Sequence, residues 1–423
     1  MRTTGHRNSI AKVAIMQIPM VQRAKNVYHL LVAILANTIH GFPARKLTVI
    51  GVTGTDGKTT TSSLIYHILK TAGKDVSLIS TVGAYIRDKT FDTGFHVTNP
   101  ASLALQKFIR YIVKNEGLQK QRYLVLEVTS HGIDQNRIWG IPFSIAVLTN
   151  ITHEHLDYHK TYDNYIRTKV RLLQRAKIAI LNKDDPSYPL VRSQITNPTS
   201  RIITYGLKDA EVNAKNSAYK SKYAGSFNHH NELAAIAVCK ELGIPEDIVK
   251  KSLDSFILPV GRLEVVYKKD FTIMIDFAHT PNAFEQLLSS IKSKGKGRLI
   301  HVFGSAGERD RSKRPEMGEV AGKYDDVIFL TSEDPRSETV EKINAQIKQG
   351  IDSGSSTRMT IEEIPDRQEA INAAVKMAKK GDFVVITGKA HEMSMNYGKG
   401  EQPWSDFSAV EIALKNKQII QNK

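Results

Sequence analysis

The stretch VIGVTGTDGKTTT, residues 49–61, decides the fold. An apolar, β-branched run, LTVIGVT (47–53), leads into it, and a helical pattern, TTTSSLIYHILKTAG (59–73), follows it and ends at Gly73. A strand, a glycine-rich turn and a helix in this order gather unpaired backbone N–H groups and the positive end of the helix dipole around one point. The stretch therefore predicts a nucleotide phosphate site at the end of a buried strand.

The residue types in this loop suit a bound triphosphate. Glycines allow tight turns and close approach of the backbone to phosphate oxygens. Lys58 can reach the outer phosphates, and the hydroxyl of Thr59 is a ligand for Mg²⁺. The spacing departs from G-x-x-x-x-G-K-[ST], because Val52 stands at the first glycine, and a glycine-rich turn with an incidental lysine is the alternative. The nucleotide contacts predicted from the loop are Gly54, Thr55, Gly57, Lys58, Thr59 and Thr60.

Short apolar runs alternate with helical patterns along most of the chain. This alternation predicts an α/β protein with mostly parallel sheets. We expect a mainly helical N-terminal segment over 1–45, a central nucleotide-binding domain over 46–257 and a smaller Rossmann-like domain over 258–423. The runs typical of strands buried on both faces are 123–128, 145–150, 178–182, 298–304, 326–331 and 382–387.

Composition limits the class of protein. The net charge of +16 favours anionic partners, among them nucleotides, phosphorylated sugars, carboxylates and nucleic acid, and a solvated basic surface is the other interpretation. The single Cys239 excludes an intrachain disulfide and favours a reducing cytoplasm. The N-terminus lacks the pattern of a signal peptide. The apolar run 27–36 falls short of the roughly 20 residues that span a bilayer, so we expect a helix packed on the body and no membrane insertion.

The loop TGTDGKTT (53–60) resembles the T-G-T-x-G-K-T-T loop of Mur ligases and folylpolyglutamate synthases. Further motifs follow in the order that the Mur ligase family shows them, over about residues 36–410. EVTSHGIDQNR (127–137) is similar to E-V-S-S-H-x-L…R, and LTNITHEHLDYH (148–159) resembles T-N-L-x-x-D-H-L-D-Y-H, with Glu154 for the usual Asp. Chance agreement of so many motifs in order is implausible.

The resemblance implies a magnesium-dependent ATP site. Glu127 and His155 match the positions that bind two Mg²⁺ ions together with Thr59. Lys169, in YIRTKVRLL (165–173), falls where the family carries a lysine modified by CO₂ to a carbamate, an N6-carboxylysine. From the residues alone, a strand-end surface acid, a zinc-binding or core histidine and a solvent-facing lysine remain the alternatives. The catalytic residues implied by the resemblance are Lys58, Glu127, His155 and Lys169.

Three later motifs resemble the nucleoside-binding segments of the family. SFNHHN (226–231) is similar to G-x-F-N-x-x-N, and LPVGRLEVV (258–266) to P-G-R-M-E, with Val260 inserted between Pro and Gly. IDFAHTPNA (275–283) resembles D-Y-A-H-T-P-D-A, with Asn282 in place of the last Asp. The nucleotide contacts implied are Asn228, Asn231, Arg262, Asp276 and His279.

The segments 304–318, 331–338 and 388–392 indicate the incoming substrate. TSEDPRSE is similar to T-S-D-N-P-R-x-E, which in this family marks members that accept meso-diaminopimelate. A guanidinium fork binds a carboxylate at two points, so Arg336 would grip the distal carboxylate; a surface salt bridge is the alternative. Glu333 and Asp334 replace Asp and Asn and make the pocket more acidic. The amino-acid contacts implied are Arg309, Glu333, Asp334, Arg336, Gly388 and Glu392.

The acceptor side and the reaction follow from the same resemblance. HVTNP (96–100) resembles a T-T-P segment, and the acceptor contacts implied are Thr98, Asn99, Thr129, Gln135 and Arg137. We expect a monomeric ATP-dependent amide ligase of peptidoglycan biosynthesis, with two Mg²⁺ ions, that adds meso-diaminopimelate to UDP-N-acetylmuramoyl-L-alanyl-D-glutamate and binds no nucleic acid. We expect the segment 1–45 to be a truncated form of the family's UDP-binding domain; a partner that supplies the rest and an acceptor without UDP are the other interpretations. A folylpolyglutamate-synthase-like or other ligase with a non-UDP acceptor, and a nucleic-acid-binding ATPase, remain the alternatives.

Overall fold

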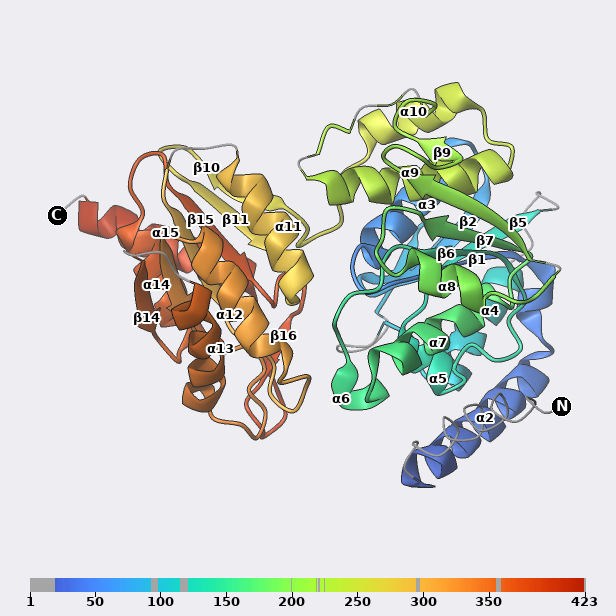
Figure 1. Ribbon diagram of the computed structural model, residues 1–423, viewed down its shortest axis with the longest axis horizontal. Coiled ribbons are helices and arrows are strands. Elements are labelled where there is room, and N and C mark those ends of the chain that lie inside the picture. Colours follow the sequence, from blue (N-terminus) through green and yellow to red (C-terminus); the bar gives the residue numbers. More distant parts are fainter. Residues whose placement is uncertain are drawn as a thin grey trace, which may run out of the picture.

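Two α/β lobes, each built on its own sheet, make up the computed structural model of the protein (Figure 1). The structure describes residues 20–92, 98–114, 121–198, 200–217, 219, 221–223, 225–293, 297–354 and 359–421. The predicted HVTNP segment lies partly outside these residues, since only Thr98 to Pro100 are described.

The first lobe contains a nine-stranded sheet in the order β4-β3-β2-β5-β1-β6-β7-β8-β9, parallel except at β3 and β4. The chain fills one side of β1 before it crosses from β5 to β6 on the other side, and this reversal opens a crevice at the carboxyl ends of β1, β5 and β6. The strands are β1 (Thr48–Thr53), β2 (Asp75–Ser80), β3 (Gly83–Ile86), β4 (Lys89–Phe91), β5 (Arg122–Glu127), β6 (Phe143–Leu148), β7 (Ile178–Asn182), β8 (Arg201–Gly206) and β9 (Val212–Asn213).

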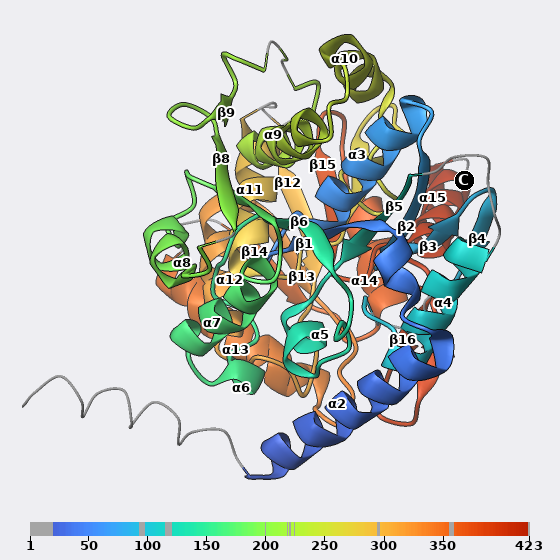
Figure 2. The same cartoon turned by 90° about the vertical axis from the view of Figure 1, so that its right-hand side faces the viewer.

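Helices cover both faces of this sheet (Figure 2). The first face packs against α3 (Lys58–Thr71), α9 (Ser226–Glu241) and α10 (Glu246–Ser255). The second packs against α4 (Ser102–Lys114), α5 (Ser130–Asp134), α7 (Tyr162–Leu173) and α8 (Tyr188–Gln194), with α6 (Leu156–His159) joining β6 to α7. The strands are therefore buried on both sides, which explains their continuous apolar runs.

The second lobe contains a six-stranded sheet in the order β10-β11-β15-β12-β13-β14, parallel except at β10. Its strands are β10 (Glu264–Lys268), β11 (Thr272–Asp276), β12 (Leu299–Phe303), β13 (Val327–Leu330), β14 (Thr360–Glu363) and β15 (Phe383–Thr387), and a small hairpin joins β16 (Ser394–Asn396) to β17 (Glu401–Pro403). One face carries α11 (Pro281–Lys292), α12 (Lys313–Tyr324) and α13 (Val340–Gly354), and the other carries α14 (Arg367–Met377) and α15 (Asp406–Gln421).

Helix α2 (Met20–His40) lies along the edge of the first lobe and leads through a short 3₁₀ helix, η1 (Pro43–Lys46), into β1 (Figure 2). It is longer than the run 27–36 predicts. One face buries Ala33, Ala36 and Asn37, and the opposite face leaves Val27, Leu31 and Leu35 exposed. Among the described residues, no helix combines the length and apolar character needed to cross a membrane.

The predicted α/β class is confirmed, and all six runs assigned to buried strands overlap strands of the two sheets. The change of sheet falls between α10 and β10, near the predicted boundary at residue 258. The exact domain limits stay a prediction.

Candidate active site

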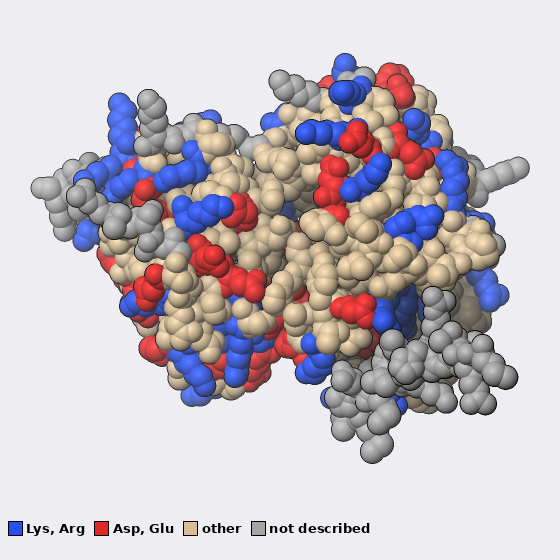
Figure 3. All heavy atoms as spheres, in the orientation of Figure 1, with Lys and Arg blue, Asp and Glu red and all other residues tan. Residues whose placement is uncertain are grey.

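A cavity of about 740 Å³ lies where the two lobes face each other. It is visible from outside as a notch between the lobes (Figure 3). The first lobe contributes the turns after β1, β5, β6 and β7, and the second contributes the turns after β11, β12, β13 and β15. Both sheets thus direct their carboxyl ends into one space, where α/β proteins bind their ligands.

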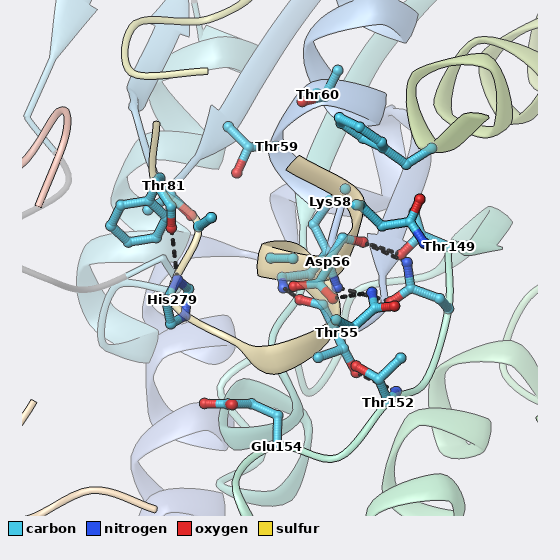
Figure 4. A pocket seen from close by; sticks show the side chains of 18 of the residues that line it. Thr55, Asp56, Lys58, Thr59, Thr60, Thr81, Thr149, Thr152, Glu154 and His279 are labelled. Atoms are coloured by element: carbon cyan, nitrogen blue, oxygen red, sulfur yellow. Dashed lines mark hydrogen bonds between the residues drawn. The ribbon is translucent and has the colours of Figure 1, made fainter. Parts of the chain in front are cut away.

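The glycine-rich turn after β1 forms the phosphate loop. Gly57 caps α3 with a left-handed backbone (φ 78°), and the Lys58 ammonium donates to Thr55 O at 2.6 Å. The Thr149 hydroxyl and the Asn150 side chain bind Asp56 O and Asp56 N and so hold the turn from β6. In Figure 4, Asp56 and Lys58 lie between His279 on one side and Thr149 on the other. Hydrogen bonds within the protein therefore hold the loop in this shape.

Glu127 lies at the end of β5, beside this loop, and only 1% of it is exposed. Its carboxylate accepts from the Thr59 hydroxyl at 3.2 Å and from the backbone N–H and hydroxyl of Thr81, each at 3.0 Å. Carboxylate and hydroxyl oxygens are hard ligands of the kind that Mg²⁺ takes alongside substrate phosphates. Among the described residues, no three His, Cys, Asp or Glu side chains form a cage for a metal on their own.

Lys169 lies behind the phosphate loop, 1% exposed, with its ammonium 2.6 Å from Gly54 O and 4.4 Å from the centre of the Tyr165 ring. Burial, followed by the nearby charge of Lys58, holds the pKa of Lys169 well below its ordinary value. Burial, followed by His131, does the same to the pKa of His155, so its imidazole is neutral at pH 7. An uncharged amine and an uncharged imidazole are the forms that bind CO₂ and metal ions, respectively.

The predicted acceptor residues form one connected network. The Asn99 amide accepts from the backbone N–H and hydroxyl of Thr129, at 2.8 and 2.9 Å, and donates to Glu127 O at 2.7 Å. Arg137 donates to Asn99 O and to the Gln135 side chain. The Thr98 hydroxyl lies 2.8 Å from that of Thr81, so this network reaches the Glu127 carboxylate.

The predicted amino-acid residues lie on three loops of the second lobe, which follow β12, β13 and β15. Asp334 and Arg336 adopt left-handed backbone conformations, with φ of 43° and 53°. Such conformations are costly for residues with side chains and concentrate at binding sites. Burial raises the pKa of Glu333 to about 8. The ammonium of Lys389 lies 2.9 Å from Asp334 and 2.6 Å from Glu392.

Direct contacts join the two lobes around the cavity. Asp56 accepts from Thr280 and Asn282, and Arg262 donates to the Thr59 hydroxyl at 3.3 Å. On the opposite wall, the buried Lys313 ammonium lies 3.1 Å from Glu154. The phosphate loop therefore touches the second lobe directly.

The cavity brings together every predicted site residue except Gly54 and Lys169, which are hydrogen-bonded to each other just behind it. Several residues that line the cavity were not predicted from the sequence. Among them are Asn182, Asp184 and Asp185, in the run LNKDD at the end of β7. Polar residues at the end of an apolar strand were the pattern that could have indicated them. Asn228 and His230 line the same cavity. Lys313 lies within the segment 304–318 but was not singled out, because its partner Glu154 lies in the other lobe.

Two family models match the chain: the Mur ligase middle domain over residues 52–239 and the Mur ligase glutamate ligase domain over residues 261–390. The UDP-N-acetylmuramoyl-L-alanyl-D-glutamate–2,6-diaminopimelate ligase of Aquifex aeolicus is 39% identical over 402 residues, which cover 90% of this chain and 80% of the relative. A solved structure of a ligase of that name is 32% identical, with a TM-score of 0.56, and the match covers 88% of this chain and 79% of the other.

A folylpolyglutamate synthase from Mycobacterium tuberculosis, solved with ADP and AMPPCP, gives a TM-score of 0.67 at 15% identity, covering 86% of this chain and 93% of the other. At that identity the match reflects a shared fold.

Proposed function

The chain belongs to the Mur ligase family, and from that premise we propose that it joins meso-diaminopimelate to UDP-N-acetylmuramoyl-L-alanyl-D-glutamate at the expense of ATP. It is an ATP-dependent ligase that forms an amide bond, and this reaction serves peptidoglycan synthesis. The observation that carries the proposal is the shared cavity, in which the phosphate loop of one lobe faces Arg336 and Arg309 of the other.

The reaction has two steps. An oxygen of the acceptor's free carboxylate attacks the γ-phosphorus of ATP, the bond from that phosphorus to ADP breaks, and an acyl phosphate forms. The amine of the incoming amino acid then attacks the acyl carbon, loses a proton, and phosphate leaves with the bonding electrons. The enzyme contributes mainly position and charge neutralisation.

The phosphate side of the proposal rests on the first lobe. The N-terminus of α3 and the Lys58 ammonium face the space where the phosphates would lie, and Arg262 approaches the same point from the second lobe. Glu127 and the Thr59 hydroxyl, already 3.2 Å apart, are the oxygen ligands we assign to one Mg²⁺, and His155 to a second. When bound, Mg²⁺ supplies positive charge that neutralises the phosphates.

A carbamate on Lys169 is part of the proposal. The group forms on an unprotonated amine, and burial, followed by the nearby charge of Lys58, lowers the pKa of Lys169 and so favours that form. Addition of CO₂ would turn this amine into an anion, which would suit a site that binds divalent ions better than an ammonium.

The amino-acid side rests on opposite charges on neighbouring loops. Diaminopimelate carries a second amino-acid centre, with an ammonium and a carboxylate. Arg336 and Arg309 offer guanidinium groups for the carboxylate, and Glu333, Asp334 and Glu392 offer acceptors for the ammonium. Lysine lacks the distal carboxylate, so it would leave the guanidinium groups without a partner.

The test is a phosphate-release screen with ATP, Mg²⁺, UDP-N-acetylmuramoyl-L-alanyl-D-glutamate and one amino acid at a time. We expect release with meso-diaminopimelate and little with lysine. Release with a pteroate and glutamate would instead favour a folylpolyglutamate-synthase-like activity, and release stimulated by nucleic acid with steep salt dependence would favour a nucleic-acid-dependent ATPase. Silence with every pair would refute the substrate assignment.

A further inference from the structure

Arg367 and Asp406 form an ion pair under the amino-acid loops, and both residues are 0% exposed. Arg367 opens α14 and Asp406 opens α15. The guanidinium Nε lies 2.8 Å from Asp406 Oδ1, and Nη2 lies 2.9 Å from Asp406 Oδ2, so the contact is two-pronged. Neither side chain reaches the cavity, and neither has a part in the chemistry described above.

Apart from a hydrogen bond of 2.9 Å that Asp406 accepts from the Trp404 indole N–H, the other hydrogen bonds of the pair go to the bases of two loops. Arg367 donates from Nη1 to Ser332 O at 3.2 Å and from Nη2 to Thr387 O at 2.8 Å. Asp406 Oδ2 accepts from the backbone N–H of Ala390 at 3.1 Å. Ser332 immediately precedes Glu333, and Thr387 immediately precedes Gly388. One buried pair therefore ties the loop of Glu333, Asp334 and Arg336 to that of Gly388 and Glu392.

The two loops approach so closely that their spacing decides the shape of the pocket. A Cβ atom on Gly388, whose φ is +102°, would lie 2.2 Å from Glu333 Oε2. Ala390, whose backbone N–H binds Asp406, has a left-handed backbone conformation with φ of 44°. A second buried contact braces the same strand end, since His301 lies 3.0 Å from the Thr387 hydroxyl and 2.8 Å from Asp325.

Net stability is a weak explanation for such a pair. Removing two charges from water costs several kcal/mol, and a well-packed apolar pair often holds a fold equally well. An apolar pair, however, cannot bind two carbonyls on different strands. The guanidinium can, because its planar fork presents five donors in fixed directions.

We propose that Arg367 and Asp406 are a positioning pair, which sets the spacing of the two amino-acid loops and thereby the affinity for the incoming amino acid. The proposal rests on the proposed function in that it takes these loops to hold the amino acid. It requires that loosening the pair act on amino-acid binding and leave ATP binding nearly unchanged.

The test compares Arg367→Lys with a matched control, Arg298→Lys. Lysine keeps the charge, but its compact ammonium cannot reach both carbonyls and both carboxylate oxygens. Arg298 makes similar contacts, to Asp382 and Met377 O, at the amino ends of strands in the same sheet. We expect Arg367→Lys to raise the KM for the amino acid about tenfold to a hundredfold, the range for hydrogen bonds to charged groups. The KM for ATP should stay within about twofold, and Arg298→Lys should change neither.

Hydrogen exchange provides a readout that needs no substrate. Amides in peptides covering 331–338 and 387–392 should exchange faster in Arg367→Lys than in the wild type or Arg298→Lys, while a peptide covering β1 should not change. If the wild type turned over no amino acid, the proposed function would fail, and this exchange comparison alone would decide the positioning role. Should Arg367→Lys not fold, Trp404→Phe removes the indole N–H bond to Asp406, together with part of a ring that packs against the core, and should give the same pattern more weakly. Equal rises in both KM values, or unchanged exchange in the two loops, would overturn the proposal.

Discussion

Asp56, in the phosphate loop of the first lobe, accepts a hydrogen bond of 2.8 Å from the side-chain amide of Asn282, at the start of α11 in the second lobe. Thr280 adds a second bond to the same carboxylate at 3.2 Å. Asp56, which lies between two glycines of the phosphate loop, is thus in direct contact with the second lobe. We therefore expect closure of the two lobes to be coupled to the geometry of the phosphate site through this contact.

Asn282→Ala should therefore weaken closure without touching a phosphate ligand. We expect kcat/KM for ATP to fall about tenfold, because a hydrogen bond to a charged group is lost. Asn282→Asp should lower kcat/KM for ATP further, because it places a second carboxylate beside that of Asp56. The effect should weaken as the salt concentration rises. Steady-state kinetics would measure both, and small-angle scattering with an ATP analogue would report closure. Wild-type kcat/KM in Asn282→Ala would contradict the coupling.

Glu127→Gln should convert a magnesium ligand into a weaker, neutral one while its bonds to Thr59 and Thr81 are largely kept. We expect kcat to fall about a hundredfold, within the range for loss of one electrostatic group in an active site. The magnesium concentration for half-maximal activity should rise as well. Phosphate release titrated with Mg²⁺ measures both effects. An unshifted magnesium curve would exclude Glu127 as a ligand.

Arg336→Lys should reduce kcat/KM for meso-diaminopimelate about tenfold to a hundredfold, since a two-point guanidinium contact with a carboxylate becomes a single-point contact. The matched control is Arg311→Lys, because Arg311 is exposed, pairs with the nearby Glu338 and does not line the cavity. Competition between diaminopimelate and lysine gives the change in selectivity directly. Equal effects in the two variants would contradict a specific role for Arg336.

Glu333 should make stability depend on pH. Burial raises its folded pKa to about 8, well above its unfolded value, so its contribution is fully present below the unfolded pKa and is lost as pH rises towards 8. Glu333→Gln removes this loss. The variant should therefore gain stability relative to the wild type by about 1.4 kcal/mol for each pH unit in that window, with a plateau above it. Urea unfolding at several pH values measures the difference, and a pH-independent difference would be inconsistent with this carboxyl.

Lys169 should make activity depend on dissolved CO₂. Buffer stripped of CO₂ should lower phosphate release, and bicarbonate should restore it, because a carbamate dissociates reversibly. Lys169→Arg should be inactive at any bicarbonate concentration, since a guanidinium does not form the group. NMR with isotope-labelled bicarbonate should show a carbamate signal only in the wild type. Bicarbonate-independent activity without that signal would remove the carbamate from the mechanism.

The sequence predicted the site best where one short segment contains both a strand and the functional side chain at its end. Lys58 and Glu127 follow directly from a strand and its turn, and the cavity contains both. Arg336 was instead predicted from the resemblance of TSEDPRSE to a motif of the Mur ligase family. Backbone N–H groups, helix ends and strand ends are local features, so local patterns are enough to place them.

Contacts between distant segments could not be predicted in this way. The Asp56–Asn282 bond spans 226 residues and the Lys313–Glu154 contact spans 159, so neither leaves a local pattern. The buried Arg367 was missed for the same reason, because its charge resembles that of a surface residue until α15 supplies Asp406. The apolar run 27–36 predicted a helix but neither its length nor its exposed face, which depend on what packs beside it.

The two lobes contribute different parts of the site, which has a consequence for exchanging lobes between homologues. The phosphate loop and the acceptor contacts belong to the nine-stranded sheet, whereas the loops assigned to the amino acid belong to the six-stranded one. A chimera that keeps the first lobe and takes the second from a homologue with another preference should inherit the donor's choice of building block with its activation chemistry intact. It should do so only if the graft supplies partners for Asp56 and Glu154 and a counterpart of Arg262, which contacts Thr59 across the lobes.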